Sequence, residues 1–198
     1  MKYLSFFLLL LFLSSTSSVL ASGTCPDSCG SSVFDPPSTA TISLAGADTC
    51  EVRITYQTRK CGTSYDVRIT AIEPLSDSCS QLTGEELIDL ATTVFMFDNP
   101  MGFPSYSDTS KVWRVYRAAC WYADTTGIIA TPTGKYKPCT DGGCCVTTVG
   151  AILNNCDGLY FIPMTQKEEI ACSGSCPGSI NVCGHNPANR FTKPTDKW

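Results

Sequence analysis

The sequence predicts a mainly β fold: disulfide-stabilised antiparallel hairpins in a sandwich-like arrangement, with one α-helix near residues 84–96. Two stretches alternate apolar and polar residues with a period of two, which is typical of strands that bury one face. One other stretch combines a helix-capping signal with an apolar stripe at helical spacing. The chain of 198 residues also holds 13 cysteines, a number that indicates disulfides in an oxidising compartment.

The first predicted hairpin spans residues 50–71. Residues 50–61 carry an apolar side chain at every second position from 52 to 56, and the alternation resumes at residue 65. A two-residue turn that begins at Gly62 places both apolar sets on the same face, whereas a slip of one residue would expose one of them. This turn pairs Tyr56 with Ile69.

The predicted helix begins after Thr83, which has the form of an N-cap, with Glu86 three residues later as the second half of a capping box. Its apolar stripe consists of Leu87, Leu90, Ala91 and Val94. Prolines and a glycine in residues 98–104 must end the helix. The region near 98–108 is therefore the best internal boundary in the chain.

The pattern in the second half of the sequence predicts one strand at 111–121 and a second hairpin, formed by residues 145–153 and 159–165. Asp157 and Gly158 form a strong turn dipeptide between these two segments. In this register Leu153 faces Ile162, and Ala151 faces Met164.

The two hairpins share a cysteine spacing that raises the hypothesis of two repeated β modules. Cys50 and Cys61 bracket the first strand of one hairpin, Cys145 and Cys156 bracket that of the other, and both pairs have ten residues between them. The offset is 95 residues (145 − 50). Because some spacings coincide by chance in a chain with many cysteines, duplication stays one of two readings.

Strand geometry restricts the disulfides. A continuous strand from 50 to 61 separates its end cysteines by about 36 Å, while a disulfide needs Cα atoms within about 7 Å. Cys50 therefore has to bond elsewhere, and Cys79, shortly after the hairpin, is the predicted partner. The repeat hypothesis extends the same clamp to Cys145 and Cys172.

Residues 1–21 predict a secretory signal peptide that is cleaved after Ala21. Lys2 supplies the positive charge, residues 3–13 form a short apolar core, and Val19 and Ala21 precede the cleavage point. A membrane anchor is the alternative, but the apolar run is shorter than the ~20 residues that span a bilayer. We expect a secreted cysteine-rich β domain at 22–198, with no membrane span.

The cysteines also allow a zinc site, because Cys25/Cys29 and Cys172/Cys176 have a ligand-like spacing and His185 is near. Disulfides are the favoured reading for an exported chain with a single histidine, so no metal is assigned. Because 13 is odd, at least one thiol must be free, blocked or bonded to another chain. We expect an intermolecular disulfide between copies of this chain.

Charge and motifs exclude several function classes. A net charge of −4 and a pI near 4.9 argue against a nucleic-acid partner. His185 lies in a turn-rich segment, and the acidic pairs Glu85/Glu86 and Glu168/Glu169 are adjacent residues whose side chains point apart. No nucleotide, cofactor or metalloprotease motif is present. We therefore assign no catalytic residue and no cofactor.

The aromatic residues of the second half suggest one further reading. Trp113, Tyr116, Trp121 and Tyr122 could form a sugar-stacking platform, although strand aromatics are more often core residues or members of cross-strand pairs. The segment from Trp113 to Trp121, the Cys144-Cys145 pair and the Cys50-to-Cys61 spacing resemble cysteine-rich exported proteins of Bacteroidota-type bacteria. This resemblance implies export and no particular activity.

These observations predict a secreted, non-catalytic protein with a structural or adhesive role outside the cell. An extracellular carbohydrate- or protein-binding module is the alternative, with a glycan or an extracellular protein as partner. A small secreted hydrolase is the third reading.

Overall fold

The protein is mainly β with one α-helix, which confirms the predicted fold class. The computed structural model describes residues 29–30, 33–44, 50–103, 111–126, 134–140, 143–154, 158–168, 176, 178 and 180–183. The predicted signal peptide at 1–21, together with Cys172 and His185, lies outside these residues.

The described strands are β1 (Ser38–Leu44), β2 (Cys50–Cys61), β3 (Ser64–Pro74), β4 (Lys111–Ala118), β5 (Cys120–Asp124), β6 (Lys135–Pro138), β7 (Cys144–Asn154), β8 (Gly158–Glu168) and β9 (Ile180–Asn181). The helices are the 3₁₀-helix η1 (Asp77–Gln81) and α1 (Gly84–Asp98). No helix in the described part of the chain is long and apolar enough to cross a bilayer.

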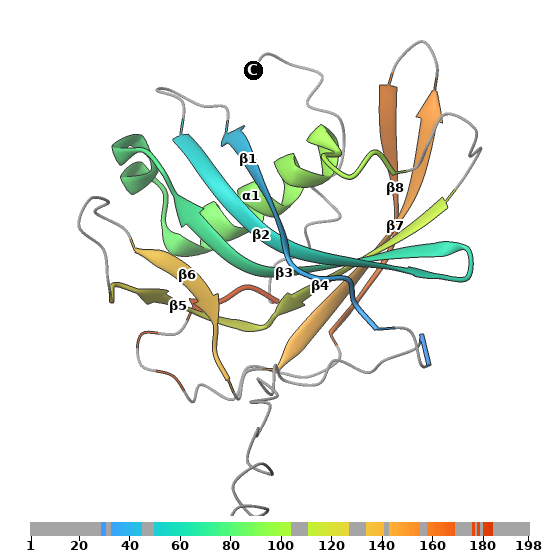
Figure 1. Ribbon diagram of the computed structural model, residues 1–198. Coiled ribbons are helices and arrows are strands. Elements are labelled where there is room, and N and C mark those ends of the chain that lie inside the picture. Colours follow the sequence, from blue (N-terminus) through green and yellow to red (C-terminus); the bar gives the residue numbers. More distant parts are fainter. Residues whose placement is uncertain are drawn as a thin grey trace, which may run out of the picture.

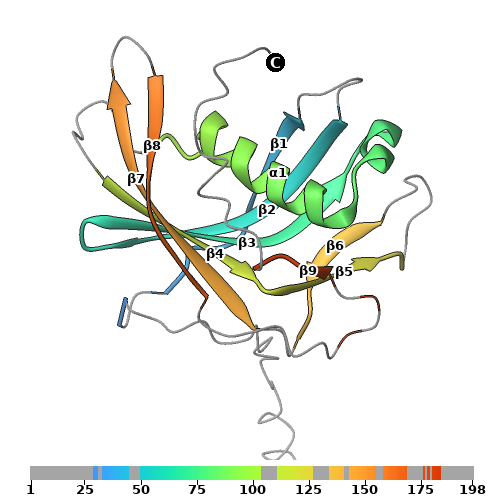
Figure 2. The ribbon, with the colours of Figure 1, turned by 180° about the vertical axis from the view of Figure 1, so that it is seen from behind.

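All of these strands belong to one mixed sheet in the order β8-β7-β4-β3-β6-β5-β9, with β2 and then β1 attached to β3. β3 is the branch point, because it pairs with β2, with β4 in parallel and with β6. The sheet curves strongly, and α1 lies against its concave face (Figures 1 and 2). A single curved sheet thus takes the place of the sandwich-like arrangement that we expected.

The first hairpin has the predicted register between its turn and Tyr56, and beyond Tyr56 the pairing is shifted by one residue. Tyr56 lies opposite Ile69, and Gly62 occupies the turn with a φ of 58°, which a side chain would disfavour. A bulge between Thr55 and Tyr56 leaves Thr70 on β3 without an opposite residue. The bulge adds twist at this point and contributes to the curvature of the sheet.

The capping box of α1 is present as predicted. The amide of Glu86 donates to Thr83 Oγ1 at 3.3 Å, and the amide of Thr83 donates to Glu86 Oε2 at 2.9 Å. Asn99 ends the helix in the left-handed conformation, with its amide donating to the carbonyl of Phe95. The helix therefore spans slightly more than the predicted 84–96.

The buried surface of α1 is wider than the predicted stripe. Leu87 and Ala91 are buried, but Leu90 and Val94 are only partly buried. The other buried helix residues are Ile88, Asp89, Thr92, Thr93, Phe95 and Met96. The reason is the curvature of the sheet, since α1 contacts β1, β2, β3 and β9 and is thus covered from several directions.

The single strand predicted at 111–121 is wrong, because the chain breaks at Ala119 between β4 and β5. Ala119 is fully buried. Its amide donates to the carbonyl of Gly143, and its carbonyl accepts from the amide of Val182. These two bonds let β4 pair with β7 while β5 pairs with β6 and β9.

The predicted register of the second hairpin is also wrong. Leu153 lies opposite Leu159 rather than Ile162, and Ala151 lies opposite Phe161 rather than Met164. Gly158 is not a turn residue but the first residue of β8, where it pairs with Asn154. Because the connection then comprises residues 155–157, the pairing shifts by three residues.

Two disulfides secure the first hairpin at opposite ends. Cys50 is bonded to Cys79, as predicted, with Cα atoms 4.7 Å apart. This bond joins the start of β2 to η1 and closes the open end of the hairpin. Beside the turn, Cys61 is bonded to Cys29, with Cα atoms 5.6 Å apart.

The predicted bond between Cys145 and Cys172 is wrong, because Cys145 is bonded to Cys183. The backbone bond from Val182 to Ala119 brings this C-terminal segment beside the start of β7, where Cys145 and Cys183 are both buried. Cys144 is disulfide-bonded as well, so these neighbouring cysteines have different partners, as expected.

The two hairpins do not form separate modules. β4 pairs with β3 on one side and with β7 on the other, and it thereby joins both hairpins into one sheet. The boundary near 98–108 follows the end of α1 and separates no second sheet. The disulfide that clamps the first hairpin also has no copy at Cys145.

The capping box predicts a measurable contribution to stability. Replacing Thr83→Ala removes the acceptor for the amide of Glu86 and should lower the free energy of unfolding by about 1 kcal/mol. Thr83→Asn retains a capping oxygen and should stay close to the wild type. Urea denaturation of the three proteins measures the difference, and equal losses for both variants would contradict a capping role.

Candidate functional site

Asp66 forms the centre of a buried ion-pair cluster on the face of the sheet that lies opposite α1. Its side chain is fully buried. Arg59 Nε on β2 donates to its Oδ2 at 2.8 Å. Arg114 on β4 donates from Nε to Oδ1 at 2.6 Å and from Nη2 to Oδ2 at 2.8 Å. Two arginines from the strands on either side of β3 thus hold one carboxylate.

The segment that precedes β1 covers this cluster. We call its described residues, 29–30 and 33–37, the N-terminal strap. The amide of Asp35 donates to the carbonyl of Thr58, and Thr58 Oγ1 donates to the carboxylate of Asp35 at 3.0 Å. Gln57 Nε2 donates to the carbonyl of Asp35 at 3.1 Å. These bonds hold the strap against β2.

Phe34 is the apolar anchor of the strap. Its ring lies 4.3 Å from the guanidinium carbon of Arg59 and 4.0 Å from that of Arg68. It also meets the ring of Tyr116 edge-on, with centroids 5.9 Å apart. Cation–π contacts of this kind strengthen when water is excluded, so Phe34 both shields the cluster and gains from it.

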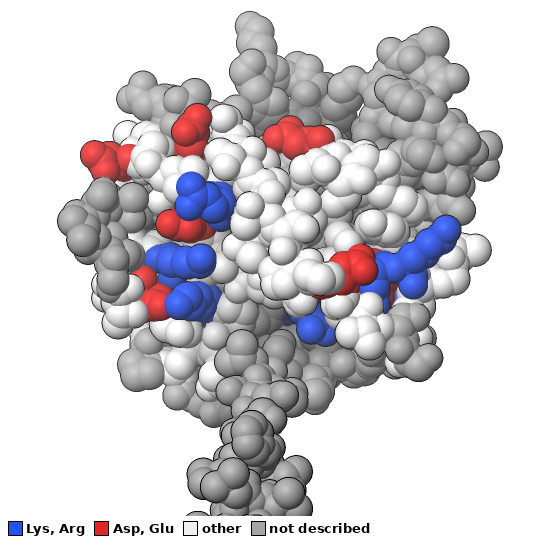
Figure 3. All heavy atoms as spheres, in the orientation of Figure 1, with Lys and Arg blue, Asp and Glu red and all other residues white. Residues whose placement is uncertain are grey.

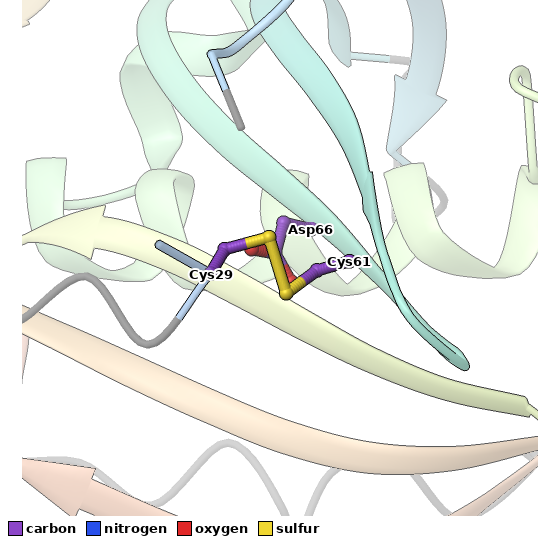
Figure 4. A group of neighbouring side chains, drawn as sticks. All are labelled: Cys29, Cys61 and Asp66. Carbon is purple, nitrogen blue, oxygen red and sulfur yellow. A yellow bond between two sulfur atoms is a disulfide. The ribbon is translucent and has the colours of Figure 1, made fainter. Parts of the chain in front are cut away.

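Cys29, Cys61 and Asp66 lie close enough to suggest a metal site, because their ligand atoms all fall within 4.8 Å of one another. Figure 4 shows, however, that the two sulfurs form a disulfide beside the carboxylate. Disulfide sulfurs are not thiolates, which are the form that binds metals. The same reasoning removes Cys176 from the zinc alternative, since it is disulfide-bonded.

The Asp66 cluster is suited to joining strands rather than to proton transfer. Both carboxylate oxygens accept hydrogen bonds from guanidinium groups, which keep their protons at any physiological pH. A buried carboxylate is tolerated only when it is paired and hydrogen-bonded. The cluster meets this condition through side chains of β2 and β4.

A second buried ion pair lies on the opposite face of β4, beneath α1. Arg117 Nη1 donates to Asp89 Oδ1 at 2.6 Å, and both side chains are at most 3% exposed. Arg117 Nε and Nη2 and Thr147 Oγ1 make no hydrogen bond within the described chain. Each such buried group costs about 1–3 kcal/mol, and more if it is charged.

The predicted aromatic platform does not form. Trp113 and Trp121 are fully buried and Tyr116 is 2% exposed, so only Tyr122 of the four residues is partly exposed. Trp113 belongs to the face of β4 that packs on the core, whereas Tyr116 contacts Phe34 on the other face. The reading of these aromatics as core residues is the correct one.

The other candidates from the sequence do not come together. Glu86 belongs to the capping box at the start of α1, and its neighbour Glu85 lies in the same helical turn. His185 and Glu169 lie outside the described residues, as does the side chain of Glu168.

The exposed charges on the side shown in Figure 3 are mostly interleaved. Glu73 pairs with both Arg53 and Lys135, and Lys137 on β6 pairs with Asp124 on β5. A broad uncharged area separates this group from the charged side chains near the β2–β3 turn. The exposed ion pairs thus neutralise one another locally.

No family model, curated protein or solved structure matches the chain. The resemblance to exported Bacteroidota-type proteins therefore remains a prediction. Any functional conclusion has to come from the geometry of the chain itself.

The sequence contained one unused signal for the Asp66 cluster. The predicted hairpin register that pairs Tyr56 with Ile69 also places Arg59 opposite Asp66, and the structure has this pair. Opposite charges across a strand pair are favourable. The burial of the pair could not be read in this way, because it depends on Arg114 and on the strap.

The buried carboxylate should contribute far more stability than an exposed one. Replacing Asp66→Asn leaves Arg59 and Arg114 without their counter-charge and should cost about 3–5 kcal/mol of unfolding free energy. Glu73→Gln, at the partly exposed pair with Arg53, should cost at most about 1 kcal/mol. Denaturant unfolding measures both, and similar losses would contradict a special role for Asp66.

The pair of Lys137 and Asp124 predicts a pH dependence. Hydrogen bonds from Lys137 and Thr126 hold the pKa of Asp124 well below its ordinary value of 3.8. The pair therefore stabilises the fold above the pH at which the unfolded carboxyl titrates, and this contribution is lost as the pH falls toward the folded pKa.

Lys137→Met should raise the pKa of Asp124 toward its ordinary value, as followed by carboxyl ¹³C NMR. Asp98, whose pKa is raised by burial, serves as the control and should titrate alike in both proteins. An unchanged pKa of Asp124 in the variant would refute the assignment.

Proposed function

We propose that the chain is a secreted, non-catalytic protein with a structural or adhesive role, and that it assembles by pairing strands at the free edge of β1. The observation that carries this proposal is the character of that edge. β1 consists of seven uncharged residues and pairs only with β2 among the described strands. Such an edge is a template for another strand.

The three end strands of the branched sheet, β1, β8 and β9, differ in the way that matters for assembly. β9 has only two residues. β8 contains Pro163, Lys167 and Glu168, and proline and charged residues are common means of blocking an edge. β1 contains none of these within Ser38–Leu44. The contrast selects β1 as the edge that accepts a partner, over about 23 Å of strand.

The disulfides supply the durability that such a role needs. Cys29–Cys61 ties the strap to the β2–β3 turn, Cys50–Cys79 closes the other end of that hairpin, and Cys145–Cys183 ties the C-terminal segment to β7. Each native disulfide typically contributes about 2–4 kcal/mol. This pattern supports an extracellular setting, where disulfides persist.

The partner that we favour is a second copy of the chain. All ten cysteines of the described chain are disulfide-bonded, and the full chain has 13. The odd cysteine is thus one of Cys25, Cys156 and Cys172. Once strand pairing brings two copies together, such a thiol could join them covalently, as a reductant-sensitive dimer band on electrophoresis.

A protein-binding module is the second candidate, because the same edge could accept a strand from a different extracellular protein. Carbohydrate binding has less support, since the aromatic platform that suggested it is buried. A hydrolase has no supporting group among the residues considered above.

Self-association should depend on the β1 edge. Thr41 is exposed, and Thr41→Lys places a charge of the kind that blocks natural edges. We expect this variant to weaken dimerisation of the mature protein at least about tenfold, as measured by analytical ultracentrifugation with the free thiol alkylated.

Gln81→Lys is the matched control, because it adds the same charge at an exposed position in η1, outside β1. It should dimerise like the wild type. A wild type that stays monomeric at every concentration, or equal behaviour of the two variants, would exclude assembly through β1.

A further inference from the structure

Arg117 has one edge of its guanidinium in use and one edge unused. Nη1 donates to Asp89 on α1, whereas Nε and Nη2 make no hydrogen bond to the described chain. Arg117 is 1% exposed, so bulk water does not solvate these donors in the folded state. Buried polar groups without partners are rare and indicate an ordered water, an ion or a ligand.

Thr147 lies on the same face of the sheet as Arg117. It pairs with Val115, two residues before Arg117 on β4, while Arg117 itself pairs with Cys145. Thr147 and Arg117 are therefore diagonal neighbours on the same face of an antiparallel pair, within reach of long side chains. Thr147 is also 1% exposed, and its Oγ1 makes no hydrogen bond in the described part of the chain.

Another arginine on β4, Arg114, shows which chemical group the Nε and Nη2 donors of an arginine bind. Arg114, three residues earlier and on the opposite face, uses Nε and Nη2 to hold both oxygens of Asp66, at 2.6 and 2.8 Å. Parallel donors at this spacing match the two oxygens of a carboxylate. Arg117 presents the same pair of donors, with the hydroxyl of Thr147 on the same face.

We propose that Arg117 and Thr147 form a binding site for a small monocarboxylate between β4, β7 and α1. The ligand oxygens would accept from Nε and Nη2 of Arg117, and Thr147 Oγ1 would donate a third hydrogen bond. This site is independent of the β1 edge, and either proposal can fail without the other.

Charge decides between a carboxylate and a larger oxyanion. Arg117 and Asp89 cancel, so a monocarboxylate leaves the buried site with one net negative charge, whereas a phosphate or sulfate dianion leaves two. Uncompensated buried charge is costly. The surroundings are apolar as well, with Trp113, Val115 and Val149 buried on the same face. The site should therefore select small monocarboxylates, with acetate as the simplest probe.

The experiment follows the Nε–H signals of the arginines by ¹⁵N NMR in the folded, disulfide-intact mature protein during titration with sodium acetate. The Nε–H signal of Arg117 should shift and saturate. The signal of Arg114 should not move, because Asp66 already occupies its donors. Sodium chloride and sodium sulfate at equal ionic strength should leave the Arg117 signal in place.

Thr147→Val removes the hydroxyl at nearly constant volume and should weaken acetate binding about fivefold. Arg53→Gln removes an exposed arginine on β2 and should bind acetate like the wild type. Amide spectra confirm that both variants are folded. An Arg117 signal that ignores acetate, or that responds equally to chloride, would show that these donors hold only water and would overturn the proposal.

Discussion

The burial of Asp66 is the constraint on which the arrangement of the sheet depends. A carboxylate that is 0% exposed must be neutralised, and the two arginines that do so come from β2 and β4, on either side of β3. Arg59 is local in sequence, but Arg114 is 48 residues away. The pair of Asp66 and Arg114 therefore secures the register of β4 beside β3, the parallel junction through which β7 and β8 join the sheet.

Two disulfides stabilise the β2–β3 hairpin at its two ends. The strap adds Phe34 above the arginines and is held to the β2–β3 turn by Cys29–Cys61 (Figure 4). Cys50–Cys79 lies at the opposite end of the same hairpin. The ion pairs of Asp66, the contacts of Phe34 and the Cys29–Cys61 disulfide thus lie in one region. Loss of the strap would expose the buried charges of Arg59 and Asp66.

The two faces of β4 each bury one arginine, and the two arginines differ in how many of their donors are used. On the face beneath the strap, Nε and Nη2 of Arg114 both donate to Asp66, which makes this side structural. On the face beneath α1, Arg117 shares only Nη1 with Asp89 and leaves a donor pair unused. The proposed assembly through β1 would use neither face, since strand pairing occurs in the plane of the sheet. A single domain could therefore combine ligand binding in its core with association at its edge.

The sequence by itself determined the features that depend on neighbouring residues. Period-two alternation and a glycine turn were sufficient for the register of the first hairpin between its turn and Tyr56, and Thr83 with Glu86 was sufficient for the start of α1. The Cys50–Cys79 bond followed from the same register, and so did the Arg59–Asp66 pair, although its burial did not. The tertiary structure alone decided the break at Ala119, the three-residue shift in the second hairpin and the Cys145–Cys183 bond. The break at Ala119 and the Cys145–Cys183 bond depend on contacts between distant segments, such as Ala119 with Gly143 and Val182, whereas the shift in the second hairpin follows from its longer connection. A local pattern carries no information about such contacts, because many distant segments can satisfy the same buried backbone group or thiol equally well.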